Sequence, residues 1–155
     1  MNLPVSKGTF ILIARVSRAK TLKIGSLGKC KIEPGYYAFV SSALGAGGLR
    51  SRLRDLESPV VAHWHIDYLL QTATLMEVWF TTAEKKLEDK WAELLDHREE
   101  FSNPIPRFGS SDYHLSRVSR LFYSKRRPSF AWFQKQVREQ FDGVAVGRHR
   151  VAPAA

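Results

Sequence analysis

The residues of this chain that could act chemically include a histidine pair in the string His63-Trp64-His65. Histidines two apart share a face on a strand and diverge on a helix. A metal site at this spacing would need a third ligand, and the sequence supplies no obvious cluster. Two interpretations of the pair therefore stay open: a chemical role, with His65 as a candidate general base, and a role in holding the fold.

Arginines form the second group of candidates. Arg50, Arg52 and Arg54 lie in a stretch with apolar residues at helical spacing, and Arg126 and Arg127 adjoin each other further on. A guanidinium group offers a planar fork to phosphate. The alternative for each arginine is an ordinary solvated charge.

The distribution of charge favours a polyanionic partner. The chain of 155 residues carries a formal net charge of +9. Residues 1–55 contribute +8, residues 56–115 contribute −6 and residues 116–155 contribute +7. Two basic flanks around an acidic middle are what a nucleic-acid binder with a metal-holding face would have.

Composition excludes several classes of protein. The only cysteine, Cys30, excludes an internal disulfide framework and a zinc site with two or more thiolates. No apolar run reaches the roughly 18 residues of a membrane span. The N-terminus lacks a signal-peptide pattern, so we expect a cytoplasmic protein with no membrane partner.

The hydrophobic pattern predicts an α/β fold of the α+β type, with a small, mainly antiparallel sheet of three to four strands flanked by helices. We expect residues 1–124 to form the main domain, and residues 125–155 to add a helix and a basic tail packed on it or extending it. The predicted strands cover residues 8–16, 35–42, 73–81 and 121–123, with a short hairpin over 21–33. The predicted helices cover residues 49–56, 63–71, 83–97, capped by Thr82, and 130–141, and residues 147–155 are a frayed tail.

Several strings occur in the order found in one known family. The chain resembles the GIY-YIG-like domain of unknown function that occurs alone or fused to endonuclease III-type glycosylases, over residues 7–124. The strings are Gly8-Thr9-Phe10, Gly35-Tyr36-Tyr37-Ala38-Phe39-Val40-Ser41-Ser42-Ala43-Leu44-Gly45, His63-Trp64-His65-Ile66-Asp67-Tyr68-Leu69, Phe108-Gly109-Ser110-Ser111-Asp112 and Leu121-Phe122-Tyr123.

The resemblance implies a divalent-metal-dependent DNA endonuclease, with Mg²⁺ or Mn²⁺ as cofactor. Arg52 matches the catalytic helix arginine, and Glu88 matches the metal-binding glutamate. A carboxylate holds Mg²⁺ through a hard oxygen, and an arginine neutralises phosphate charge. The alternative for Glu88 is a surface residue paired with Lys85 or Lys86.

The sequence departs from the family pattern at several polar positions. Phe10 and Phe39 stand where tyrosines are expected, and neither ring can accept a proton. Ser41 replaces a glycine, and Leu56 stands near an expected histidine. Tyr113 and Leu115 replace cysteines, and the family's Ser-His-Leu-Phe-Tyr reads Ser119-Arg120-Leu121-Phe122-Tyr123. A working nuclease would need another base, for which His65, Tyr37 or a metal-bound water are candidates.

Three functions remain open. The first is the metal-dependent endonuclease, with impaired activity. The second is a catalytically inactive nucleic-acid-binding module on the same fold, with Arg50, Arg54, Arg126 and Arg127 on phosphates. The third is an interaction domain whose helix 130–141 docks a DNA-repair partner, although its apolar face fits the chain's own core better.

Asp67 and Asp112 are expected to cap a helix or a turn, and Tyr36, Tyr37, Phe39 and Trp79 to be core residues.

Overall fold

The apolar run near the N-terminus forms the central strand of a sheet. β1 (Gly8–Val16) pairs antiparallel with β4 (Gly35–Ala43) on one side and with β5 (Thr74–Thr81) on the other. Its first seven residues are buried, as expected for a strand covered on both faces. A Cβ at Gly8 would lie 2.0 Å from the Thr81 carbonyl oxygen, so only glycine allows β5 to approach here.

The computed structural model describes residues 3–57, 64–109 and 119–151. The main sheet has the order β6-β4-β1-β5-β7, with β6 spanning Leu121–Ser124 and β7 spanning Gly147–Arg150, and all its pairs are antiparallel. A separate hairpin consists of β2 (Lys20–Lys23), a 3₁₀ turn (Gly25–Leu27) and β3 (Lys29–Ile32). The predicted α/β class and antiparallel sheet are confirmed.

The sheet gains a fifth strand where the sequence predicts a frayed tail. Residues 147–150 read Gly-Arg-His-Arg and pair with β5, and the Val151 N–H donates to the Met76 carbonyl at 2.9 Å. The prediction was wrong because this edge strand has no apolar alternation. Its backbone hydrogen bonds to β5 are a tertiary feature that local sequence does not encode.

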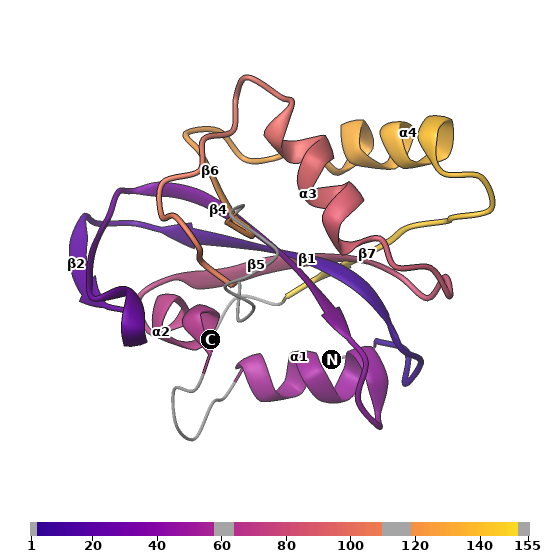
Figure 1. The fold of residues 1–155 in the computed structure, drawn as a ribbon, viewed down its shortest axis with the longest axis horizontal. Helices are drawn as coiled ribbons and strands as arrows, with labels where there is room; N and C mark the ends of the chain where they lie inside the picture. The colour runs from indigo at the N-terminus through magenta and orange to yellow at the C-terminus, as the bar shows by residue number, and fades with distance from the viewer. Residues whose placement is uncertain (1–2, 58–63, 110–118, 152–155) are drawn as a thin grey trace.

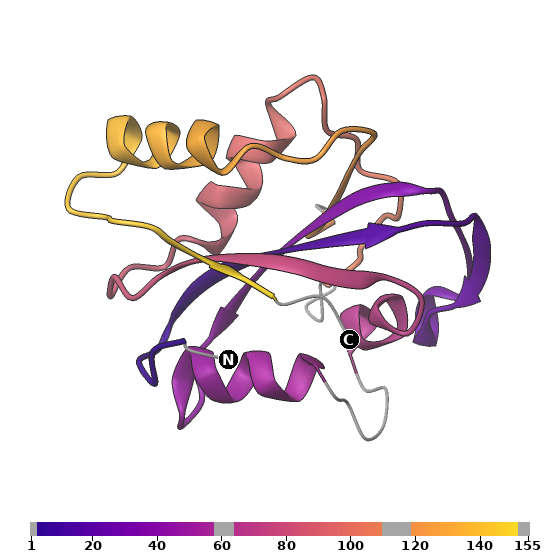
Figure 2. The same ribbon diagram turned by 180° about the vertical axis from the view of Figure 1, so that it is seen from behind.

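Two helices cover each face of the sheet (Figures 1 and 2). The helices α1 (Gly48–Glu57) and α2 (His65–Leu70) lie on one face, and α3 (Glu88–Asp96) and α4 (Phe130–Gln140) lie on the other. Alternate residues of β1 supply the two cores. Phe10 and Leu12 pack toward α1 and α2, whereas Ile11 and Ile13 pack toward α3 and α4.

The C-terminal helix packs on the chain's own core, as the sequence favoured. Ser129 caps α4 by accepting a hydrogen bond from the Trp132 N–H at 3.2 Å, while Phe133 and Val137 are fully buried. No helix within the described ranges is long and apolar enough to cross a membrane.

The helix predicted from residue 83 begins later. The Ala83 N–H donates to the Thr81 hydroxyl at 3.2 Å, and Lys85 Nζ donates to the Asp142 carbonyl at 2.7 Å. These contacts hold the segment in an open turn, and α3 starts only at Glu88. The prediction that Thr82 caps this helix was therefore wrong. The Thr81 hydroxyl accepts the Ala83 N–H instead and holds these residues in a turn that is not helical.

Candidate functional site

Glu88, the predicted metal ligand, lies in the first turn of α3 beside β4. The Ser42 hydroxyl donates to Glu88 Oε2 at 3.0 Å, and Arg120 Nε lies 3.5 Å from Glu88 Oε1. The lysine alternative is wrong in this structure, since the ion pair of Glu88 is with Arg120 and Lys85 bonds a carbonyl instead. A carboxylate in the first turn of a helix is also favoured by the helix dipole.

Arg120 is the functional candidate that sequence reasoning missed. Its side chain is only 10% exposed and also bonds the Asp89 carboxylate. Its backbone is fixed on both sides: the Arg120 N–H donates to the Phe108 carbonyl at 2.8 Å, and the Val40 N–H donates to the Arg120 carbonyl at 3.0 Å. One feature of the sequence could have pointed to Arg120: it stands where the family string has a histidine.

His65 is the first residue of α2, and its ring is half-buried. Its Nδ1 accepts a hydrogen bond from the Gly109 N–H at 2.9 Å, and its ring packs on Phe108 with the ring centroids 5.5 Å apart. Burial lowers the pKa of His65. The neutral ring therefore carries its proton on Nε2, which can donate to a phosphate oxygen, whereas Nδ1 is already occupied.

Gly109 connects His65 to Arg120. Its φ is +76°, and an added Cβ would lie 2.7 Å from Phe39 Cε1 and 3.0 Å from Arg120 Cβ. Only glycine can hold this conformation in so narrow a space. The structure thus links two predicted residues on opposite faces of the sheet, His65 of α2 and Glu88 of α3, through Gly109 and Arg120. We call the resulting group the edge cluster; its residues are Ser42, His65, Glu88, Gly109 and Arg120.

Arg52 lies on α1, over the start of α2. Its guanidinium carbon is 5.9 Å from the ring centroid of Trp64, the residue before His65. Burial lowers the pKa of Arg52, while the carboxylates of Asp67 and Asp55 act to raise it. Asp67 accepts the Trp64 N–H at 2.9 Å, which confirms the predicted capping role. Arg52 therefore adjoins the edge cluster through Trp64 and, among the described residues, makes no ion pair with Glu88.

Tyr37 is placed in the core, which supports the structural alternative for this residue. Its side chain is 2% exposed, and its hydroxyl donates to the Glu33 carbonyl at 2.7 Å. Burial, opposed in part by that hydrogen bond, raises the pKa of Tyr37 to about 12. Phe10 and Phe39 are buried in the same core, as is Trp79 on the other face.

The predicted phosphate-binding arginines occupy different places. Arg50 Nε donates to the Leu3 carbonyl at 2.7 Å and so ties the N-terminal segment to α1. Arg54 and Arg126 are exposed. Arg127 Nη2 bonds Glu77 Oε2 at 2.8 Å, on the far side of the sheet from α1. His63 and Asp112 lie outside the described residues.

The residues around Glu88 do not fit a divalent cation as they are arranged. Mg²⁺ takes carboxylate oxygens together with waters and substrate oxygens. Here the guanidinium of Arg120 already contacts both Glu88 and the neighbouring Asp89. In the ranges that the structure covers, no group of three or more histidine, cysteine, aspartate or glutamate side chains is placed to hold a metal ion.

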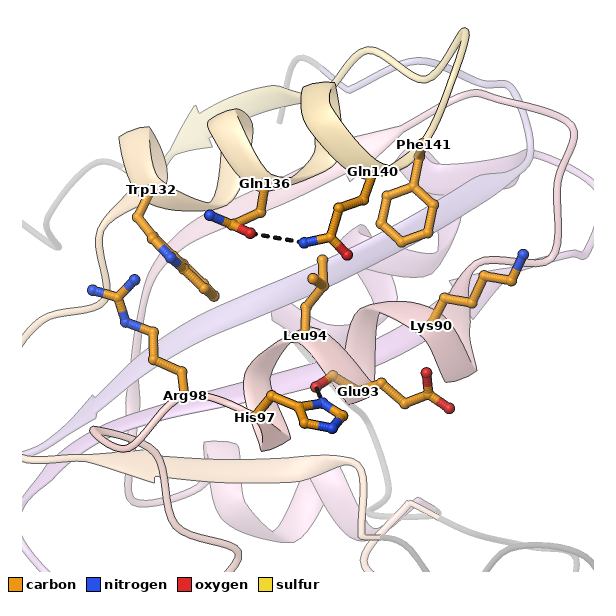
Figure 3. Close-up of a pocket in the computed structure, with 9 residues that line it drawn as sticks. All are labelled: Lys90, Glu93, Leu94, His97, Arg98, Trp132, Gln136, Gln140 and Phe141. Atoms are coloured by element: carbon orange, nitrogen blue, oxygen red, sulfur yellow. Dashed lines mark hydrogen bonds between the residues drawn. The ribbon is translucent and has the colours of Figure 1, made fainter.

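A recess of about 590 Å³ lies between α3 and α4, away from the edge cluster (Figure 3). Several of its polar groups bond within the chain: His97 Nδ1 lies 2.7 Å from the Glu93 carbonyl oxygen, and Gln140 donates to Gln136 at 2.8 Å. None of the predicted catalytic, metal-binding or phosphate-binding residues lines it, but four of its lining residues belong to the predicted helix 130–141. The lining residues are Lys90, Glu93, Leu94, His97, Arg98, Trp132, Gln136, Gln140 and Phe141.

The fold and the edge cluster define an α/β protein. The polar residues of this cluster lie beside β4 and the residue that precedes β6. A family model described as "Domain of unknown function DUF123" matches residues 9–142, and the chain belongs to this family. No curated protein and no solved structure matches the chain significantly.

Proposed function

We propose that this chain is a nucleic-acid-binding module with a GIY-YIG-like fold, and that DNA is its partner. The observation that carries the proposal is the pairing of Glu88 with Arg120, which supplies a cation of the chain at the position of the expected metal ligand. The order of the family strings and the family match support the fold assignment.

The side chains around the cluster suit phosphate rather than hydrolysis. Arg52 presents a guanidinium over the ring of Trp64, with its carbon 5.9 Å from the ring centroid, and such planar cations bind phosphate oxygens well. His65 offers an Nε2 N–H donor in its neutral form. Neither group needs a metal to hold a phosphodiester, and the tyrosine hydroxyls of the family pattern are replaced by the buried rings of Phe10 and Phe39.

The second candidate is the divalent-metal-dependent endonuclease, with Mg²⁺ or Mn²⁺ as cofactor. The observation in its favour is the contiguity of the predicted catalytic residues. Arg52 contacts Trp64, His65 bonds Gly109, and Gly109 packs on Arg120 beside Glu88. In this alternative Arg120 would have to leave Glu88 when the metal and the substrate bind.

One paired assay separates the two candidates. Wild-type protein is mixed with plasmid and duplex DNA, in EDTA and in Mg²⁺ or Mn²⁺, and both binding and cleavage are measured. We expect binding in EDTA with a slope of log K on log salt near −4, equivalent to about five phosphate contacts, and no cleavage above that of Glu88→Gln. Binding unchanged at ~0.5 M salt would contradict a phosphate-dominated contact.

The matched control is Glu93→Gln, which removes the same charge from an exposed position of α3 outside the cluster. The endonuclease would be established by metal-dependent cleavage that Glu88→Gln and Arg52→Ala abolish and Glu93→Gln preserves. This result would refute the proposal of a catalytically inactive binding module.

A further inference from the structure

Three arginines converge on one end of the sheet face that also carries α4. Arg148 and Arg150 lie on β7 directly opposite Trp79 and Glu77 of β5, so their side chains share a face with those residues. Arg127, in the segment before α4, bonds the Glu77 carboxylate from the same side. Figure 2 shows β7 lying along β5 at the edge of the sheet.

Arg127 is held in a fixed orientation by a buried carboxylate. Glu77 is 2% exposed, and its Oε1 accepts the indole N–H of Trp79 at 2.6 Å, which leaves Oε2 for Arg127 at 2.8 Å. The side chain of Arg127 is 45% exposed, so its other N–H groups reach solvent. A guanidinium anchored on one edge and open on the other is already oriented for a second oxyanion.

The two arginines of β7 extend this surface. The guanidinium carbon of Arg148 lies 5.0 Å from the ring centroid of Phe130, and Arg150 is exposed. Neither makes an ion pair with any of the residues that the structure covers. Residues two apart on a strand lie on one face about 7 Å apart, so they form a row of charges rather than a single site. The three arginines thus lie near a single carboxylate, that of Glu77, which already bonds Trp79 and Arg127.

We propose that this surface, which we call the arginine face (Arg127, Arg148 and Arg150), binds the phosphate backbone of duplex DNA. The inference rests on the proposed nucleic-acid binding and names a surface for it. β7 lies beyond residue 142, where the family match ends. A lipid surface is disfavoured because the exposed large apolar side chains of the described residues, Val5, Leu44 and Trp64, belong to other segments.

The arginine face is separate from the edge cluster. Ser42 pairs with Thr9 near the start of β1, whereas Glu77 pairs with Ile13 near its end. Four residues of a strand span roughly 13 Å, and the three strand spacings from β4 to β7 add about 14 Å across the sheet. Single substitutions at one of the two places should therefore leave the other unchanged.

The test measures duplex-DNA affinity by fluorescence anisotropy at several salt concentrations, for wild type and for Arg148→Gln/Arg150→Gln. We expect a roughly 10- to 100-fold loss at ~0.1 M salt and a salt slope smaller by about 2, equivalent to two lost phosphate contacts. The matched control is Lys23→Gln/Lys29→Gln, which removes two charges from the exposed hairpin and should change affinity by less than about threefold. Circular dichroism checks that both variants are folded.

Arg127→Lys provides a second variant, because it retains a charge beside buried Glu77 and loses only the fork. It should weaken DNA binding several-fold. If wild type binds DNA and both sets of arginine variants bind like the hairpin control, the arginine face is refuted while the proposed function stands. If wild type binds no DNA, both fail. Arginine-dependent binding to phosphatidylserine vesicles without arginine-dependent DNA binding would also overturn the proposal.

Discussion

The guanidinium of Arg120 lies against the carboxylate of Glu88, with 3.5 Å between Arg120 Nε and Glu88 Oε1. Arg120 directly precedes β6, and Glu88 lies in the first turn of α3. β4 contacts both residues, through Val40 and Ser42. The family resemblance implies a metal ion at this carboxylate. The ion pair therefore places a fixed cation of the chain where a removable one is expected.

Replacing Arg120 by methionine should destabilise the protein by about 1–2 kcal/mol. The loss leaves Glu88 partly buried without its cation, but the cost is below that of a fully buried pair because solvent reaches a third of Glu88 and most of Asp89. Chemical denaturation of the single variants and of Arg120→Met/Glu88→Gln checks this in a double-mutant cycle. Strictly additive effects would show that the two side chains do not interact.

His65 should make stability depend on pH. Its folded pKa is lowered below the unfolded value of about 6.5, so the unfolded chain binds the proton more readily. The contribution of His65 is therefore complete above pH 6.5 and is lost as the pH falls below it. Melting temperatures from pH 5 to 8 test this, and His65→Gln should flatten the profile. An identical profile in His65→Gln would contradict the lowering of the His65 pKa by burial.

Most of the sheet can be predicted from the sequence because its strands have strong local signals. The apolar run of β1, the aromatic run of β4 and the mixed run of β5 each specify a buried strand. β7 cannot be predicted, because its polar residues form a strand only when the edge of β5 is there to pair with them.

The site is less predictable than the fold. His65 lies in one of the family strings, and the resemblance implies Glu88 as the metal ligand, but the sequence does not show what contacts either residue. Arg120 and Gly109 are brought next to Glu88 and His65 only in the folded chain, where the residues around Phe108 and β6 pack beside β4. Such contacts join residues far apart in the chain, and no periodicity encodes them.

Restoring the first tyrosine of the family pattern should cost stability and add no activity. The Phe10 ring is 0% exposed and packs toward α1, so Phe10→Tyr buries a hydroxyl among apolar side chains. The expected cost is about 1–3 kcal/mol. Melting temperature and DNA cleavage are measured on the same variant. Cleavage above wild type with unchanged stability would place this ring in an active site.

Tyr37→Phe should leave DNA binding unchanged and destabilise the fold by about 1 kcal/mol. The substitution removes the hydrogen bond to the Glu33 carbonyl but retains the ring that packs 5.2 Å from Tyr123. With its pKa near 12, the Tyr37 hydroxyl stays protonated at neutral pH. A loss of DNA binding or of cleavage in the folded variant would give Tyr37 a chemical role that its burial argues against.

The most direct measurement is Mn²⁺ binding followed by electron paramagnetic resonance, on wild type, Glu88→Gln, Arg120→Gln and the double variant. If Arg120 takes the place of the cation, wild type and Glu88→Gln bind Mn²⁺ equally weakly. Arg120→Gln then gains a site, because Glu88 and Asp89 are freed for a hard cation, and the double variant loses it. Mn²⁺ binding by wild type that Glu88→Gln abolishes would contradict this and support the metal-dependent endonuclease.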